Sequence, residues 1–387
     1  MDKRVYFLMI VSFIVGMVEL IISGLLDLIA KDLDVSLGAA GFLVTIFSLI
    51  FAIASPILLI MTAKIERKKL TLNFLVLFLL GNIISVISPT YTILLLGRII
   101  SALSGALLII LCLVMAPRLV EPKYRGRAIG IVSMGVSGSL VLGVPIGLML
   151  GEMFSWRAPF ILISVLTAFS IIGVYLWMDR VEPRPSVPIG KQLATLKSRR
   201  ILFAHITTFL YMTGHSVLYT YLKPFLQESM DLEATWISVI FLIFGIAAVS
   251  GGGIGGTLAD TLGTKRTVIS AIVLFGVIMM IIPFTTGIMP IFIITLIIWG
   301  IMSWAISPAM QSYLIESSPE TADIQQSLSN SSLHFGIAVG AFFGGIIIGQ
   351  FTTDANAFVG GILIIASLGS MYVSLRSGNS TKASTTN

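Results

Sequence analysis

Twelve long apolar runs decide what this chain can fold into. They lie near residues 5–29, 40–62, 71–88, 92–117, 128–150, 158–178, 201–225, 235–256, 267–284, 288–308, 325–350 and 357–375. Each is close to the roughly 20 residues that a helix needs to cross the hydrocarbon core of a bilayer. Only 11% of the residues are charged, whereas a soluble domain has about 25%. The runs therefore predict an all-α membrane protein with 12 transmembrane helices, and they exclude soluble enzymes and nucleic-acid binders.

The segment between the sixth and seventh runs differs in composition from the rest of the chain. Residues 179–200 contain six Lys and Arg and three Pro, which separates six runs from six more. The sequence predicts a six-helix bundle over residues 1–178, a cytoplasmic linker over 179–200, a second six-helix bundle over 201–375 and a polar C-terminal tail over 376–387.

Lys and Arg residues are distributed unevenly between the loops. If both termini are cytoplasmic, 20 of the 24 lie on that side, and only Lys31, Arg98, Arg157 and Lys223 do not. Positive loops stay in the cytoplasm, so this orientation is predicted, and the net charge of +6 records those loops rather than an anionic partner. The single cysteine, Cys112, lies in an apolar run with no cluster of metal ligands, so we expect neither a disulfide nor a metal site.

The two halves resemble each other at three places. GMVE at 16–19 corresponds to MTGH at 212–215, FAIA at 51–54 to FGIA at 244–247, and the glycines 147 and 151 to 345 and 349, with offsets of 196, 193 and 198. A nearly constant offset indicates a duplicated six-helix unit. Two parallel six-helix halves are the architecture of one large class of secondary transporters.

The loop after the eighth run carries the strongest local motif. Residues 256–266 read GTLADTLGTKR and match the G-x-L-x-D-x-x-G-x-[KR]-[KR] loop of the major facilitator superfamily. Its glycines permit a tight turn, and its carboxylate can accept hydrogen bonds from a helix N-terminus; the alternative is a merely tight, solvated loop. The predicted gating residues here are Gly256, Asp260, Gly263, Lys265 and Arg266. The counterpart in the first half, residues 62–69, has no glycine and only one carboxylate, Glu66, so its role stays open.

The fourth and fifth runs contain two further elements that resemble this family. Arg98 lies in LGRIISALSG, near the outer third of its run, where an arginine is costly unless it pairs or faces water. The alternative is a cation that snorkels to the interface. Gly143, Pro145 and Gly147 resemble the glycine-proline signature of the antiporter branch and predict a bending point in the fifth run.

Ionisable groups inside the runs are few. Glu19 lies 14 residues into the first run, about 21 Å along a helix and past the membrane midplane. An ionised carboxylate is expensive there, so Glu19 is the leading candidate for proton coupling, with a permanently protonated structural glutamate as the alternative. His215, at the equivalent position of the second half, is predicted to titrate or to hydrogen-bond substrate. Arg98 completes the predicted coupling set.

The second half concentrates amides and aromatic rings, which suit a flat heteroaromatic ligand. The predicted substrate-binding residues are Tyr211, His215, Tyr219, Trp304, Gln311, Gln326, Asn330 and His334. The competing interpretation is packing together with interfacial belts of Trp and Tyr, which fits Trp299 and Tyr313 better than Trp304 or Tyr211.

Several stretches resemble bacterial purine efflux pumps in the drug:proton antiporter branch of the major facilitator superfamily. They are VGMVEL, TAKIERKKL, APRLVEPKYRGRAIGI, TGHSVLYTYLKPFL, IWGIMSWAISPAMQSYLIE and DIQQS. The resemblance implies export of purine bases (similar to hypoxanthine, adenine or guanine) or ribonucleosides by alternating access, driven by the proton gradient without a cofactor. It implies a functional monomer in the bacterial cell membrane, whose partners are the substrate, protons and the lipid bilayer. It also implies that Glu19 couples transport to protons and that Arg98 is the arginine of the family's motif in the fourth run.

Two other functions compete with purine export. One is a broad-specificity multidrug:proton antiporter of the same fold, for which cationic substrates are expected. The other is a membrane-embedded enzyme or sensor, but the sequence contains no H-E-x-x-H, no G-x-S-x-G, no phosphate loop and no extramembrane domain. The sequence therefore predicts a transporter and not an enzyme.

Overall fold

The computed structural model describes residues 2–121, 124–182 and 189–383, and the side chains of 189, 323 and 378–383 lie outside the description. Across these ranges every regular element is helical, which confirms the predicted all-α class. The predicted linker (179–200) and tail (376–387) fall partly on residues 183–188 and 384–387, outside the described residues. α16 (Thr353–Ala383) continues into the start of that tail.

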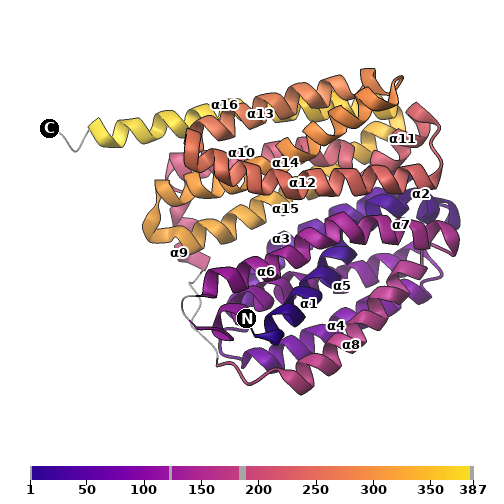
Figure 1. Cartoon of the computed structure of the whole chain (residues 1–387), viewed down its shortest axis with the longest axis horizontal. Coiled ribbons are helices and arrows are strands. Elements are labelled where there is room, and N and C mark those ends of the chain that lie inside the picture. The colour runs from indigo at the N-terminus through magenta and orange to yellow at the C-terminus, as the bar shows by residue number, and fades with distance from the viewer. Residues whose placement is uncertain (1, 122–123, 183–188, 384–387) are drawn as a thin grey trace. The chain divides into compact units, whose positions relative to one another are not determined.

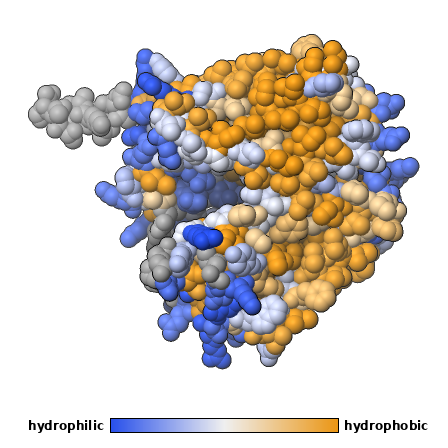
Figure 2. Space-filling view, in the orientation of Figure 1, coloured by the Kyte–Doolittle hydropathy of each residue, from blue (hydrophilic) through white to orange (hydrophobic). Residues whose placement is uncertain are grey.

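The described helices account for the predicted membrane spans. Eleven of them are long and apolar enough to cross a membrane. α1 (Lys3–Leu20) and α2 (Ile22–Asp32) meet at a bend of 47° and pass the same test as a pair, which makes twelve if the pair is one span. Figure 2 shows hydrophobic side chains spread along the flanks of the helices, with hydrophilic ones gathered toward their ends, as a lipid solvent requires.

The chain divides into two compact units, Met1–Ser186 with Glu233–Leu242, and Val187–Leu232 with Ile243–Asn387. The first contains α1, α2, α3 (Leu37–Met61), α4 (Arg67–Ile87), α5 (Tyr91–Met115), α6 (Arg125–Gly138), α7 (Val144–Met153) and α8 (Ala158–Trp177), drawn in indigo to magenta in Figure 1. The second contains α9 (Ile189–Thr195), α10 (Arg199–Tyr219), α11 (Leu222–Met230), most of α12 (Ala234–Leu262), α13 (Thr264–Ile281), α14 (Met289–Ser317), α15 (Ala322–Gln350) and α16.

The regular α-helix of the fifth run is interrupted where its sequence predicts a bending point. A π-helical turn, Ser139–Gly143, separates α6 from α7, and Pro145 follows in the first turn of α7. Proline has no N–H to donate to the preceding turn, so the hydrogen-bond ladder must rearrange around it. The π turn is that rearrangement, and it interrupts the regular hydrogen bonding of the helix at the glycine-proline element.

Glycines spaced four apart let helices pack closely in both units. The closest neighbours of a Cβ at each would be Met17 at Gly143, Ile21 at Gly147, Thr213 at Gly340 and Val217 at Gly344. The glycines of the second unit lie 197 residues after those of the first unit, and their neighbours on α10 lie 196 residues after Met17 and Ile21. The two units therefore repeat the same contact. The sequence-based pairing of glycine 147 with 345 is wrong by one residue, because the packing equates it with Gly344.

Candidate functional site

Arg98 occupies the interior of the first unit. Its side chain on α5 is fully buried, so the snorkelling alternative is wrong. Nη1 donates to the Val18 carbonyl of α1 at 2.7 Å, and the guanidinium lies 4.2 Å from the centroid of the Phe47 ring of α3. Nε and Nη2 have no hydrogen-bond partner among the described residues. A buried charge held in this way leaves two donors for a further acceptor.

Glu19 lies beside this arginine. It follows Val18 directly, near the end of α1 and just before the bend into α2, and its side chain is half-buried. Its carboxylate and the Arg98 guanidinium attract each other electrostatically. The structure thus brings two of the three predicted coupling residues together in one unit, where gain or loss of a proton on Glu19 changes the charge facing Arg98.

His215 lies in the second unit, inside a cluster of aromatic rings. Its imidazole stacks on Tyr219 with centroids 5.1 Å apart and planes 18° apart, and Phe244, Phe275 and Trp299 surround it at 6.2, 5.9 and 5.8 Å. Trp299 Nε1 donates to His215 Nδ1 at 3.2 Å. An indole can only donate, so Nδ1 must carry a lone pair, and the ring is neutral with its proton on Nε2.

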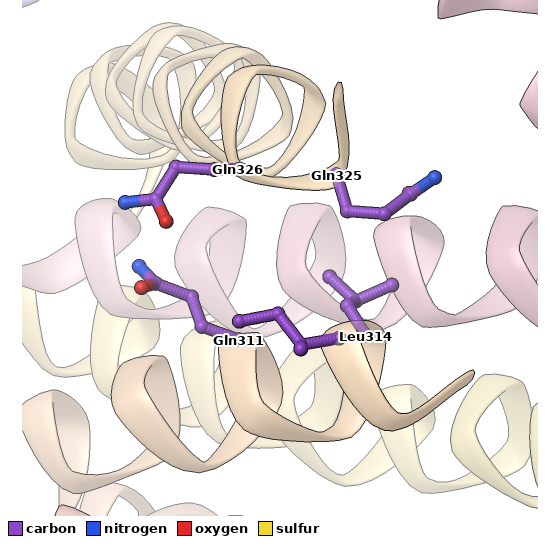
Figure 3. Close-up of a pocket in the computed structure, with 5 residues that line it drawn as sticks. Gln311, Leu314, Gln325 and Gln326 are labelled. Atoms are coloured by element: carbon purple, nitrogen blue, oxygen red, sulfur yellow. The ribbon is translucent and has the colours of Figure 1, made fainter. Parts of the chain in front are cut away.

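The predicted amides lie between α14 and α15. Gln311 and Gln326 line a narrow indentation with Leu314, Ile315 and Gln325, which has no room for a water molecule in this arrangement of the side chains. In Figure 3 the amide groups of Gln311 and Gln326 point toward each other, whereas Gln325 points away. Gln325 is already engaged, because its Oε1 bonds His205 Nε2 at 2.9 Å and its Nε2 donates to Thr321.

One face of α15 carries three of the predicted lining residues. Gln326, Asn330 and His334 follow at intervals of four, so they form a single polar stripe, with the first two exposed and the third buried. Amides that are exposed in a spanning helix are costly against lipid, which makes this stripe a candidate for contact with substrate. Tyr211 is buried on α10, one turn before His215, and Trp304 is half-buried on α14.

The loop motif lies between α12 and α13. Gly263 has a φ of +87°, which explains why a glycine stands there. Thr264 Oγ1 donates to Glu316 at 2.9 Å and joins the start of α13 to the end of α14. Asp260, Lys265 and Arg266 are exposed at the two helix ends, and Gly256 is half-buried about one turn before Asp260 in α12.

In the counterpart loop of the first unit, Glu66 has a capping role that its sequence left open. Its carboxylate accepts from the Lys68 and Lys69 N–H groups at 2.7 and 2.8 Å, at the start of α4, and from the Val181 N–H at 2.8 Å. Burial raises the pKa of Glu66, but these three backbone donors outweigh it and hold the pKa below its usual value. Arg67 is buried and donates to the Thr62 carbonyl near the end of α3.

Two aromatic residues pack inside the second unit, which agrees with the packing part of the competing interpretation and not with its interfacial part. Trp299 is fully buried in the His215 cluster. Tyr313 is fully buried too: its hydroxyl accepts from Arg200 Nε at 3.2 Å and bonds Ser374 at 3.0 Å. The sequence did not predict the roles of Phe47, Phe244 and Phe275, and nothing distinguishes Phe47 or Phe275 among the 23 phenylalanines. The only available signal for Phe244 was its place in the repeated FGIA stretch.

Two pseudo-repeated six-helix units with polar groups inside them define a secondary transporter of the kind that moves small molecules. The family model of the Major Facilitator Superfamily matches residues 8–330 and 204–386, and the chain belongs to that family. It is a multi-pass membrane transporter rather than an enzyme.

Similar proteins agree with this assignment. An uncharacterized MFS-type transporter of Bacillus subtilis (strain 168), YbcL, is 34% identical over 94% of this chain and 95% of its own length. Another, YtbD of the same organism, is 29% identical over 92% and 91%. Among solved structures, a peptide transporter POT with sulfate matches with a TM-score of 0.80 at 13% identity, over 98% of this chain and 95% of its own. A bacterial homolog of the human lysosomal transporter Spinster, inward-facing and occupied, gives 0.75 at 15%, over 98% and 96%. At these identities the structures show the fold alone.

Proposed function

We propose that this transporter exports purine bases or ribonucleosides by alternating access, in exchange for protons. The observation that carries the proposal is the pair formed by Glu19 and the fully buried Arg98, whose Nε and Nη2 lack a hydrogen-bond partner within the described residues. The resemblance of the chain to purine efflux pumps supports the substrate class.

The pair supplies two states that differ by one charge. When Glu19 is ionised, its charge offsets that of Arg98, and the arginine has an acceptor for its spare donors. When Glu19 binds a proton, the guanidinium stands alone in a site with little water. Coulomb energies are large at such short range and low dielectric, so the two protonation states favour different arrangements of α1 and α5. Proton binding can then drive a conformational step.

The second unit supports a flat, neutral ligand. With Nδ1 occupied by Trp299, His215 has Nε2–H left as a donor beside a stacking ring. Gln311 and Gln326 add amides, which both donate and accept, as the edges of a purine do. Because Arg98 offsets the charge of Glu19, this pair offers little attraction to a cation, and that favours purines over the multidrug alternative.

Transport into inside-out vesicles tests the proposal. Reconstituted vesicles with an acidic lumen should accumulate labelled hypoxanthine or adenine, and the accumulation should vanish when the pH gradient is collapsed. Glu19→Gln should abolish gradient-driven accumulation, while Glu152→Gln, a carboxylate exposed at the end of α7, should leave it intact. Unchanged coupling in Glu19→Gln would overturn the role of Glu19. Preferred uptake of cationic dyes over purines would instead favour the multidrug antiporter.

A further inference from the structure

A basic groove lies in the second unit, and none of the residues proposed for substrate binding or proton coupling lines it. It is formed where α10 begins and α16 approaches its end, and it encloses about 380 Å³. The lining residues are Arg199, Tyr372, Val373, Arg376 and Ser377. Arg199, Tyr372 and Arg376 are exposed, so the groove is open and its charges are accessible.

Its depth relative to the membrane follows from the helices that form it. The candidate spans begin at Arg199 in α10 and end at Ser377 in α16. Both arginines therefore lie at the boundary of an apolar span, at the level where phospholipid headgroups lie. Tyr372, a little over one turn before the end of that span at Ser377, has the amphipathic ring that is typical of this boundary.

The groove is electropositive from more than one source. The Arg376 guanidinium lies 4.5 Å from the centroid of the Tyr372 ring, and the Arg199 guanidinium 5.9 Å from that of Phe203, so aromatic faces hold both. Arg199 is also the first residue of α10, where the helix dipole is positive. In the described part of the chain Ser198 makes no side-chain cap bond to that helix. Among described lining residues there is no carboxylate to offset these charges.

We propose that this groove binds the headgroup phosphate of an anionic phospholipid. Guanidinium groups match phosphate oxygens with paired N–H donors, and the Ser377 hydroxyl is a further donor. Val373 and the Tyr372 ring give the groove an apolar part, which suits the glycerol and upper acyl region of a lipid better than a fully hydrated anion. The site is independent of the proposed substrate and of proton coupling.

Thermal unfolding of the purified full-length protein in detergent tests this assignment. Titration with dioctanoyl phosphatidylglycerol should raise the Tm to saturation, whereas dioctanoyl phosphatidylcholine and inorganic phosphate should not. The double variant Arg199→Gln/Arg376→Gln should bind phosphatidylglycerol about 30-fold more weakly, since each cation near an anionic headgroup contributes about fivefold. Arg125→Gln/Arg127→Gln removes the same charge from the exposed start of α6 and should respond as the wild type does.

Other outcomes would overturn the proposal. An unchanged phosphatidylglycerol response in the Arg199/Arg376 variant would place the lipid elsewhere. An equal, saturable response to inorganic phosphate would make the groove a site for small anions and not for lipid. If the double variant does not fold, Arg376→Gln alone is used, because this exposed residue lies near the end of α16. It should weaken binding about fivefold, and full wild-type affinity would contradict the assignment.

Discussion

Arg98 and His215 are each held in the membrane interior by one uncharged partner. The Val18 carbonyl accepts from Arg98, and the Trp299 indole donates to His215. Each bond uses one nitrogen of the side chain. The other nitrogens remain as hydrogen-bond donors, Nε and Nη2 in the arginine and Nε2 in the histidine. A buried polar atom without a hydrogen-bond partner costs free energy. Such an atom is therefore expected where a proton or a ligand binds to it during function. At this scale the proposed coupling role falls to Glu19 with Arg98, and the role proposed for His215 is recognition rather than titration.

Replacing Trp299 tests the recognition role. Trp299→Phe keeps a ring in the cluster but removes the bond to Nδ1, so His215 is no longer restricted to one tautomer. We expect purine binding to weaken about fivefold to tenfold, the equivalent of one hydrogen bond of about 1–1.5 kcal/mol. Dependence on the pH gradient should persist. Equilibrium binding of labelled adenine measures the effect, with Trp236→Phe, an exposed tryptophan, as the control. Equal affinities in both variants would assign Trp299 to packing alone.

Glu66 makes stability depend on pH outside the membrane. Its pKa is lowered in the folded state, so the stabilisation is present above the unfolded value of about 4.3 and is lost as the pH falls through the folded value. Glu66→Gln should destabilise the protein by about 1 kcal/mol at pH 7, as expected for a lost helix cap. The difference in Tm between variant and wild type should shrink below about pH 4. Thermal unfolding between pH 3.5 and 7 measures it, and Glu182→Gln, on an exposed neighbouring carboxylate, should show no such trend.

Between elements, the same glycine contact occurs twice. α7 packs on the bend between α1 and α2 through Gly147, and α15 packs on α10 through Gly340 and Gly344. In each unit this contact joins the first and fifth helical runs, so the helix carrying Glu19 or His215 has a close neighbour along its length. The missing Cβ makes room for the Ile21 side chain at Gly147 and for backbone carbonyls of α10 at Gly340 and Gly344, and such small residues are common between membrane helices. The fifth run of each unit is therefore packed directly against the helix that carries Glu19 or His215.

Two glycines of α15 form a matched test of this contact. A Cβ at Gly340 would overlap the Thr213 carbonyl of α10, whereas a Cβ at Gly349 meets nothing within 4 Å. Gly340→Ala should therefore destabilise the protein by about 1–3 kcal/mol, since backbone must move. Gly349→Ala should be neutral or slightly stabilising, because alanine favours a helix. Tm values in one detergent compare them. If Gly340→Ala is as stable as Gly349→Ala, the close packing of α10 and α15 is wrong.

At the scale of the whole molecule, the sequence predicts the features that follow from long residue patterns. It does not predict the features that follow from contacts between residues far apart in the chain. Apolar runs and the loop motif predict the helices, because a bilayer imposes length and polarity on every span. The π turn before Pro145 follows from a pattern that is equally local. By contrast, the bond of Glu66 to Val181 joins residues far apart in sequence, and no local pattern indicates it. The His215 cluster likewise brings Tyr219, Phe244, Phe275 and Trp299 together from four helices.

The orientation of the molecule in the membrane is a prediction from charge alone, and this chain suits a direct test of it. Its single cysteine, Cys112, is fully buried, so thiol reagents should not label the wild-type protein. Ser198 precedes α10 and Gly287 lies between α13 and α14; both are exposed, and a Cβ at Gly287 meets nothing within 4 Å. Three spanning helices separate them, α10, α12 and α13, so they lie at opposite ends of the second unit.

A membrane-impermeant maleimide applied to intact cells should therefore distinguish the two positions. If the cationic loops are cytoplasmic, Gly287→Cys is labelled at once, and Ser198→Cys only after the cells are permeabilised. The opposite pattern would place both termini outside and reverse the direction of every step proposed above. Labelling of both in intact cells would mean that one of the three helices between them does not span. Because neither position lies near Glu19 or His215 in the sequence, transport should survive in both variants and confirm that the labelled protein is folded.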